Sequence, residues 1–269
     1  MKEETMPSRK QKNSWLGRYV RKWYSLWIRP HITKDINQQR IKLLWFIWGY
    51  WPILFDKSLA FSSRIGLVAK FLRVDWNVPH GHHPCEIANI CLALTERPAN
   101  TGEIMVEAGC WQGGSSAKFS IICKMMDYKL YIYDSFEGVE ELSAEAKQKS
   151  FDYSGKYKAT ELILRENLKK YGELEICSIH KGWFAETLAL NPLHEPIRGA
   201  YIDCDIAKGT LEVLQGTIPG LVGDGWIFSQ DFQIKPVQDL VYDPGTWKKL
   251  GKDAPKVTRL CGNLAILKF

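Results

Sequence analysis

Residues 107–116 read EAGCWQGGSS, and this glycine-containing turn lies between two apolar segments. Turns that bind nucleotide phosphates read G-x-G-x-x-G or G-x-x-x-x-G-K-[ST]. Here an acid, Glu107, stands two residues before the first glycine, and the turn carries no lysine. An acid at this position would repel a pyrophosphate, so the turn predicts a ligand that has no phosphate.

The sequence on both sides of the turn alternates between short apolar strands and helices. We expect strands over 103–109, 129–134, 174–182, 200–205 and 225–231, and helices over 115–126, 159–172 and 209–218. Residues 256–269 indicate a hairpin with Gly262 and Asn263 at its turn. This alternation predicts an α/β fold: a Rossmann-like, mostly parallel sheet with helices on both faces and a C-terminal antiparallel hairpin.

Charge is distributed unevenly along the 269 residues. Residues 1–50 contain eleven Lys and Arg against three Asp and Glu, a net charge of +8, whereas the rest of the chain carries −2. We therefore expect a basic, aromatic-rich, helical N-terminal extension over 1–79 and a near-neutral globular domain over 80–269. With 45% hydrophobic residues, the chain is long enough to bury one sizeable core.

The extension supports two interpretations. Residues 1–14 are polar and expected to be disordered, whereas 15–29 place aromatic and aliphatic residues at helical spacing between basic ones. Such a helix would bind the surface of an anionic membrane. Alternatively the extension, and 43–75 in particular, packs as a lid or as the contact of a homo-oligomer. No stretch reaches the ~20 apolar residues of a membrane-spanning helix, and no nucleic-acid-binding module is recognisable.

Cysteine and histidine spacing argues against disulfides and structural metal sites. The seven cysteines include no C-x-x-C pair and lie mostly in apolar segments, which is typical of reduced, buried thiols. No signal peptide is recognisable, so we expect a cytoplasmic protein, at the inner face of a membrane if the extension binds lipid. His80, His82 and His83 lack the spacing of a structural zinc site, and we expect them in a loop at the mouth of the substrate site.

Acidic residues end four of the expected strands. They are Glu107, Asp134, Asp203 (with Asp205 close behind) and Asp231. A single acid of this kind would most often be a helix N-cap. Because the carboxyl ends of parallel strands meet at one edge of the sheet, where ligands bind, four acids there indicate a binding site.

This edge suits S-adenosylmethionine, which has an ammonium group, a sulfonium and no phosphate. Glu107 would attract the ammonium, and the helix start near Ser115 would donate hydrogen bonds to the carboxylate. Gly109 and Gly113 allow the backbone to approach the ligand closely. Asp134 follows Gly109 by 25 residues, near the spacing at which an acid meets a ribose hydroxyl.

Six segments resemble, in their order and spacing, the macrocin O-methyltransferase (TylF) family. They are VEAGCWQGGSSAKFS, YIYDSFEG, RENLKKYG, HKGWFAETL, YIDCDIAKGTLEVL and GWIFSQDF. The resemblance covers roughly residues 80–269. It implies a class I S-adenosylmethionine-dependent O-methyltransferase whose acceptor is a hydroxyl of a small molecule or glycan, such as a sugar or a glycosylated or lipid-linked natural product.

The resemblance also implies which residues bind the cofactor. Glu107, Gly109 and Gly113 would hold the methionine part, Asp134 would bind the ribose, and Trp183 would lie near the adenine. The full set of expected cofactor residues is Glu107, Gly109, Trp111, Gly113, Ser115, Asp134, Ser135 and Trp183.

The family that the sequence resembles uses Mg²⁺, held by an acid of the DCD segment, here Asp203, and by a pair of acids after the next strand. In this chain the pair reads Gln230 and Asp231, so one expected carboxylate is an amide. Mg²⁺ takes oxygen ligands, so Asp203, Gln230 and Asp231 remain a metal site of lower charge, for which Asp205 would compensate. The alternative is that Gln230 only hydrogen-bonds the substrate or the backbone.

Methyl transfer to an alcohol depends on activating the nucleophile, because an alcohol is hardly ionised near neutral pH. A metal ion lowers the pKa of the hydroxyl, and a carboxylate takes the proton. Asp203 is the first candidate for this base, and His180 is the second. Two other functions stay open: an NAD-dependent oxidoreductase, which Glu107 disfavours, and a non-catalytic scaffold with a methyltransferase fold, which Gln230 favours.

Overall fold

The computed structural model describes residues 48–142 and 152–269. These residues belong to a compact unit that spans Phe46–Phe269. The expected disordered segment 1–14 and the expected helix over 15–29 lie outside the described residues.

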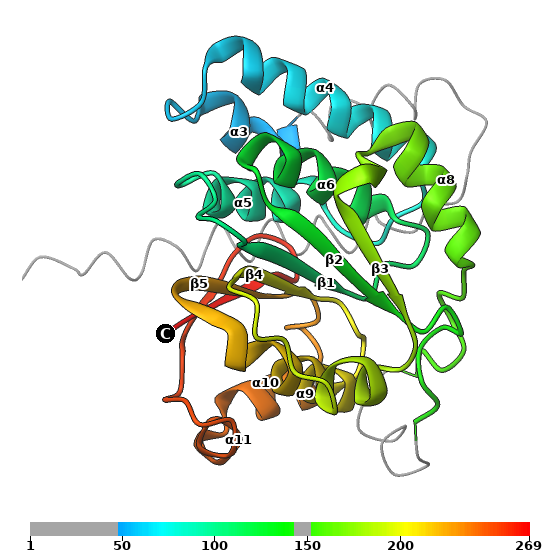
Figure 1. The fold of residues 1–269 in the computed structure, drawn as a ribbon, viewed down its shortest axis with the longest axis vertical. Coiled ribbons are helices and arrows are strands. Elements are labelled where there is room, and N and C mark those ends of the chain that lie inside the picture. Colours follow the sequence, from blue (N-terminus) through cyan, green and yellow to red (C-terminus); the bar gives the residue numbers. More distant parts are fainter. Residues whose placement is uncertain (1–47, 143–151) are drawn as a thin grey trace, which may run out of the picture. The chain divides into compact units, whose positions relative to one another are not determined.

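Seven strands of the described chain form one sheet (Figure 1). They are β1 (Ile104–Ala108), β2 (Lys129–Asp134), β3 (Cys177–Lys181), β4 (Ile197–Ile202), β5 (Leu221–Ser229), β6 (Lys256–Arg259) and β7 (Ala265–Lys268). Their order across the sheet is β3-β2-β1-β4-β5-β7-β6. Strands β1 to β5 are parallel, whereas β7 runs antiparallel to β5 and β6 antiparallel to β7. The expected sheet, with its C-terminal hairpin, is confirmed.

The strand order reverses between β1 and β4, because β2 and β3 lie on one side of β1 while β4 and β5 lie on the other. All five residues of β1 are buried, as in a central parallel strand that is covered on both faces. Ligands of open α/β sheets bind at such a reversal, outside the carboxyl ends of the strands. The loops after β1 and β4 are therefore the place to look for the site.

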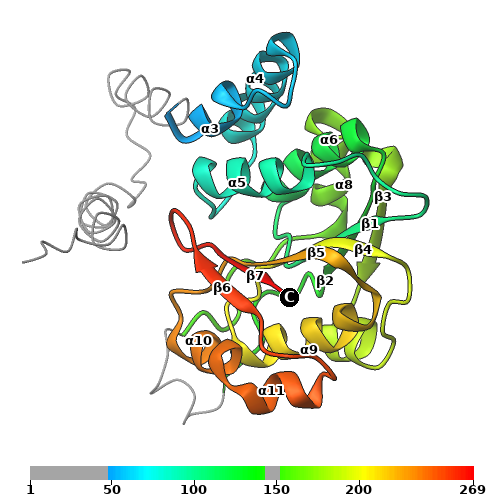
Figure 2. The same cartoon turned by 90° about the vertical axis from the view of Figure 1, so that its left-hand side faces the viewer.

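Helices cover both faces of the sheet (Figures 1 and 2). One face carries α4 (Phe61–Asn77), α5 (Pro84–Leu94), α6 (Gly114–Met126) and α8 (Glu161–Tyr171), with the short α3 (Trp51–Phe55) against α4 and α5. The other face carries α9 (Ala207–Thr217), α10 (Lys235–Tyr242) and α11 (Pro244–Lys249). Short turns η1 (Leu174–Ile176), η2 (Ala185–Ala189) and η3 (Ile218–Gly220) complete the connections. A hydrophobic core lies on each face of the sheet. Successive side chains of β1 point to opposite faces, so Met105 packs in the core on the α6 side and Val106 in the core on the α9 side.

Helices α3 and α4, which the sequence assigns to the extension, pack on the same hydrophobic core as the sheet. Tyr50, Phe71 and Val74 are fully buried in one cluster with Ile87 of α5 and Phe119 of α6. Each of these helices is apolar along one stripe, and burial of that stripe joins it to the core.

An aromatic patch on and just before α3 comprises three exposed side chains, those of Trp48, Trp51 and Phe55. The ring of Trp51 lies 6.5 Å from that of Trp48 and 5.8 Å from that of Phe55, so these side chains are contiguous. None of the helices within 48–142 and 152–269 is long and apolar enough to cross a bilayer.

The cysteines depart from the expectation of reduced thiols. Cys85 and Cys261 form a disulfide, with 6.3 Å between their Cα atoms. The two residues are 176 positions apart, so no local spacing in the sequence indicates the pair. They meet because the turn of the β6–β7 hairpin packs against the start of α5. The expectation is therefore wrong for these two cysteines, whereas Cys91, Cys110, Cys123, Cys177 and Cys204 are free thiols.

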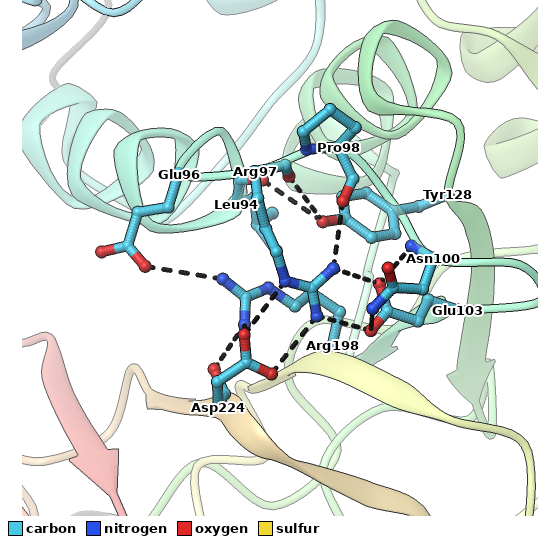
Figure 3. Close-up of polar contacts among 9 residues, drawn as sticks. All are labelled: Leu94, Glu96, Arg97, Pro98, Asn100, Glu103, Tyr128, Arg198 and Asp224. Atoms are coloured by element: carbon cyan, nitrogen blue, oxygen red, sulfur yellow. Dashed lines mark hydrogen bonds and ion pairs between the residues drawn. The ribbon is translucent and has the colours of Figure 1, made fainter.

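An ion-pair network holds the amino ends of the strands together (Figure 3). Arg97 pairs with Glu103, the residue before β1, at 2.6 Å and with Asp224 of β5 at 3.0 Å. Arg198 of β4, whose side chain is almost fully buried, pairs with Asp224 at 2.7 Å. The network ties β1, β4 and β5 at the edge opposite their carboxyl ends, so it does not obstruct the ligand edge.

Candidate active site

The turn after β1 contains two glycines in a backbone conformation that other residues rarely adopt. Gly109 and Gly113 both have φ of +86°, in the left-handed region. A Cβ atom on Gly109 would lie 1.9 Å from the carbonyl oxygen of Asp203. The close approach at Gly109 is therefore between two loops of the protein, and it holds Asp203 beside the turn. Gly113 is the N-cap of α6.

Asp134, the last residue of β2, is bound to the same turn. Its Oδ2 accepts hydrogen bonds from the backbone N–H groups of Cys110 at 2.8 Å and Trp111 at 3.1 Å, and its Oδ1 accepts one from Phe136 at 2.7 Å. A carboxylate has roughly four acceptor positions. Asp134 therefore shapes the turn and retains the capacity to accept one hydroxyl of a ribose.

Glu107 lies in β1 beneath the turn and is fully buried. The hydroxyl of Ser115, in the first turn of α6, donates to its Oε1 at 2.5 Å, whereas Oε2 has no hydrogen-bond partner among the described residues. Burial raises the pKa of Glu107 to about 8. Because a buried polar atom without a partner is costly, a donor such as an ammonium group would be stabilised here.

One pocket at the carboxyl edge of the sheet collects most of the expected site residues. Its lining includes Gly109, Trp111, Ser115, Asp134, Ser135, Trp183, Asp203, Gln230 and Asp231. Three expected residues do not line it: Glu107 lies beneath the turn, Gly113 packs against Leu164, and His180 lies on β3.

The side chain of His180, on β3, packs against the neighbouring strand β2. Its ring stacks on that of Tyr133, its register partner on β2, with 4.4 Å between centroids and 9° between planes. Its Nε2 is buried without a hydrogen-bond partner among the described residues, and burial lowers its pKa. The geometry therefore places His180 away from the pocket that Asp203 lines.

Three carboxylates converge after β4 and β5. The Oδ2 of Asp231 accepts hydrogen bonds from the backbone of Cys204 at 2.8 Å and of Asp205 at 2.7 Å, and the hydroxyl of Tyr201 donates to Asp203 at 3.1 Å. Asp205 has φ of +60°. Burial raises the pKa of Asp203, and repulsion from Asp231 and Asp205 raises it further. Burial also raises the pKa of Asp231 and Asp205, because the three carboxyl groups cannot all ionise readily without a compensating positive charge.

Gln230 adjoins these acids and is almost fully buried. Its Nε2 donates to the carboxylate of Glu86 on α5 at 3.0 Å, whereas its Oε1 is buried without a partner among the described residues. Mutually repelling carboxylates and a free amide oxygen are the oxygen ligands that a divalent cation prefers. The residues present therefore fit Mg²⁺, at a lower ligand charge than two adjacent acids would give.

A second group of candidate ligands is already neutralised by a lysine. Side-chain atoms of Asp75, His80 and His82 lie within 4.8 Å of one another. However, the ammonium of the fully buried Lys118 bonds to Asp75 and lies 2.7 Å from Nε2 of His82. The ammonium thus occupies the place that a cation would take, and we assign this group as a buried ion-pair network.

Sequence reasoning located the histidine loop but missed the aromatic wall of the pocket. His80 and His82 line the pocket, as expected, whereas the ring of His83 caps α5 by accepting a hydrogen bond from the backbone of Cys85 at 3.1 Å. Trp111 meets Tyr157 edge to face at 5.5 Å. Tyr153, Tyr157 and Phe184 complete this wall. The two tyrosines lie in an irregular segment without periodicity, so only their proximity in space identifies them.

A profile of the macrocin-O-methyltransferase (TylF) family matches residues 91–261. The matched range is more than half of the chain and includes the turn, Asp134 and the acids after β4 and β5. The chain belongs to the macrocin-O-methyltransferase (TylF) family. The expected family and enzyme class are thereby confirmed: the protein is an S-adenosylmethionine-dependent O-methyltransferase.

Solved methyltransferase structures are similar to this chain. The O-methyltransferase NovP superposes with a TM-score of 0.58 at 20% sequence identity, over 69% of this chain and 80% of NovP. The calicheamicin methyltransferase CalS11 has a TM-score of 0.48 at 16% identity, over 98% of this chain and 95% of CalS11. No curated protein sequence matches the chain.

Proposed function

We propose that this protein methylates a hydroxyl group of a sugar, free or part of a larger glycosylated acceptor, with assistance from a divalent cation held by Asp203, Gln230 and Asp231. One observation carries the proposal. The turn after β1, Asp134 and the acids after β4 and β5 all line a single pocket. A cofactor at the turn and an acceptor hydroxyl at the acids would therefore share one space.

The cofactor would lie along the turn and the end of β2. The N-terminus of α6, with the Ser115 hydroxyl, would bind its carboxylate. Glu107, which lies beneath the turn and does not line the pocket, would attract the ammonium by its charge, and Asp134 would accept a ribose hydroxyl. Trp183, about 38% exposed, offers a flat apolar face for the adenine.

The acceptor would meet the acids with its hydroxyl and the aromatic wall with its ring. Carboxylates and amides hydrogen-bond hydroxyl groups, whereas Trp111 and Tyr157 present apolar faces on which the C–H face of a sugar packs. This combination of polar and aromatic groups favours a sugar over a purely apolar alcohol. The family name, taken from a macrocin methyltransferase, supports the same class of acceptor.

The chemistry requires a proton acceptor more than a proton donor. The oxygen–methyl bond forms as the sulfur–methyl bond breaks, the hydroxyl proton leaves, and the departing thioether is neutral. A bound divalent cation would lower the pKa of the hydroxyl. Asp203 is our first assignment for the base, because it lines the pocket and its pKa is raised toward the range of an effective base. Asp205, which also lines the pocket, is the second, ahead of His180.

A screen with labelled methyl donor tests the proposal. The full chain would be incubated with methyl-labelled S-adenosylmethionine, Mg²⁺ and panels of nucleotide sugars, glycosylated small molecules and lipid-linked glycans. We expect label in the sugar of at least one acceptor and none in matched apolar alcohols. Transfer to an amine or a carbon atom instead would contradict the assigned acceptor.

We also propose that residues 15–29 bring the enzyme to an anionic membrane surface. The sequence supports this through its basic and aromatic residues. The exposed aromatic patch at α3 supports it as well, because contiguous exposed apolar side chains mark surfaces that bind lipid or protein. The same features would serve a homo-oligomer contact, so the experiment in the Discussion separates the two.

A further inference from the structure

The hydrogen bond between Gln230 and Glu86 determines which end of the Gln230 amide is left free. Both oxygens of Glu86 already accept backbone hydrogen bonds, Oε2 from His83 at 2.6 Å and Oε1 from Asn263 at 2.6 Å. The NH₂ end of the Gln230 amide donates to Oε2 of Glu86 at 3.0 Å, as it must when this carboxyl group is ionised and can only accept. The carbonyl oxygen of Gln230 is therefore the end without a partner.

This orientation matters because an amide beside three carboxylates has two opposite ways to act. If its NH₂ group faced the acids, it would donate to them directly and take part of the role of a cation. With its NH₂ group committed to Glu86, it instead presents its buried, unpartnered Oε1. An oxygen in this position suits a divalent cation and would add to the repulsion if none were bound.

We propose that Glu86 is a positioning residue for the cation site: it holds the amide of Gln230 with its oxygen free for the cation, and it supplies the negative charge that an amide at position 230 lacks. The inference rests on the proposed function, because it assumes a cation at Asp203 and Asp231. Glu86 is fully buried and is hydrogen-bonded to Gln230, the residue next to Asp231. It contributes as a neighbour of a ligand, as outer carboxylates of metal sites do.

Glu86 is held in place more firmly than a helix cap requires. As the third residue of α5 it completes a capping box with His83, which needs only the bond to the His83 backbone. The bonds to Asn263 and Gln230 are additional. A Cβ atom on Gly262 would lie 1.9 Å from its Oε1, so the hairpin turn closes directly onto this carboxylate. The Cys85–Cys261 disulfide joins the same two segments.

Direct measurement of metal affinity tests the inference without using turnover. Mn²⁺ and Mg²⁺ would be titrated by calorimetry into the full chain saturated with S-adenosylhomocysteine. We expect Glu86→Gln to weaken the affinity for metal by about tenfold or more, as loss of an outer-shell partner does. The paired exchange Glu86→Gln with Gln230→Glu should regain most of that affinity, because it moves the same charge across the same hydrogen bond.

A matched control separates this effect from general destabilisation. Glu103 is also a buried glutamate that accepts a backbone hydrogen bond, from Asn100 at 2.7 Å, but it lies at the opposite edge of the sheet. Glu103→Gln should lower the melting temperature and leave the metal affinity unchanged. If Glu86→Gln fails to fold, Gln230→Met provides the second test, since it removes the amide oxygen while preserving the length of the side chain.

Each result bears on a distinct claim. Equal metal affinity in the original protein and Glu86→Gln would overturn the inference and leave the proposed cation site intact. Equal affinity in the original protein and Gln230→Met would overturn both the inference and the role of Gln230 as a ligand. If the paired exchange does not regain affinity, the claim that Glu86 supplies the negative charge missing at position 230 is overturned. Absence of metal binding by the unmodified protein would overturn both the inference and the metal part of the proposed function.

Discussion

The carboxylate of Asp134, at the end of β2, accepts a hydrogen bond of 2.8 Å from the backbone of Cys110, in the turn after β1. A second bond from Trp111 to the same oxygen makes the acid part of the structure of the turn. The residue that the sequence assigns to the ribose thus also organises the loop that would bind the rest of the cofactor. Loss of Asp134 should affect both functions.

Asp134→Ala should weaken S-adenosylhomocysteine binding by about 1–3 kcal/mol, the usual effect of losing hydrogen bonds to a charged group. Asp127→Ala is the control, because Asp127 is an exposed acid at the other end of α6. Calorimetry on both variants measures the difference. Unchanged affinity in folded Asp134→Ala would show that the ribose lies elsewhere.

The stability of the protein should depend on pH through Glu107. Burial raises its pKa from 4.5 to about 8. Between these values the folded protein retains a proton that the unfolded chain has released, so the free energy of unfolding should fall as the pH rises through this window. A shift of this size corresponds to a loss of up to about 5 kcal/mol. Urea unfolding at a series of pH values from 5 to 9 measures this loss.

Glu107→Gln should remove this part of the pH dependence, because an amide does not titrate. Glu103→Gln provides the contrast: the bond to Arg97 lowers the pKa of Glu103, so its stabilising effect is present above its ordinary pKa and lost as the pH falls. Identical pH profiles for the original protein and Glu107→Gln would contradict the raised pKa.

Substitution of the acids after β4 should reduce turnover without changing the affinity for the cofactor. Asp203→Asn should abolish turnover and leave the affinity for S-adenosylhomocysteine nearly intact, because it removes the proposed base and a cation ligand together. Asp205→Asn should reduce turnover less if Asp203 is the base. The reverse ranking in initial-rate measurements with a labelled acceptor would transfer the role of base to Asp205.

Gly109 should tolerate no side chain. Gly109→Ala would place a Cβ atom 1.9 Å from the carbonyl oxygen of Asp203 at a φ of +86°, and we expect it to cost about 3 kcal/mol or more. Gly102→Ala is the matched control, since Gly102 has a φ of +79° but no atom within 4 Å of the added Cβ. Gly102→Ala should lower the free energy of unfolding only by the cost of placing an alanine at a positive φ, about 1 kcal/mol. Chemical denaturation that gives equal costs would contradict the contact between the two loops.

Membrane binding should depend on the basic segment. The full chain is expected to sediment with phosphatidylglycerol vesicles at low salt and much less with phosphatidylcholine vesicles, because each basic residue near an anionic surface contributes about 1 kcal/mol. A chain that begins at residue 31 should lose this binding and keep its affinity for S-adenosylhomocysteine. If the full chain ignores anionic vesicles at low salt, the homo-oligomer contact is favoured, and sedimentation equilibrium would test it.

The sequence by itself determined the order and type of the elements that carry the site. Apolar runs of strand length alternate with amphipathic helices, and this local periodicity predicted β1, β2 and α6 to within a residue or two. The acids at the strand ends followed from the same periodicity, because the carboxyl ends of parallel strands share one edge. Asp134, Asp203 and Asp231 accordingly line one pocket.

Only the tertiary structure decided which of these groups face the pocket and which partners they have. Gln230 lies 144 positions from Glu86 and Cys261 lies 176 from Cys85, and no local pattern connects residues at such separations. The same holds for His180, whose position at a strand end suggested catalysis but whose ring stacks on β2. Local sequence sets backbone conformation, whereas contacts between distant side chains follow from how sheets and helices pack. That packing brought the charge of Glu86 beside the amide where the sequence alone shows a missing acid.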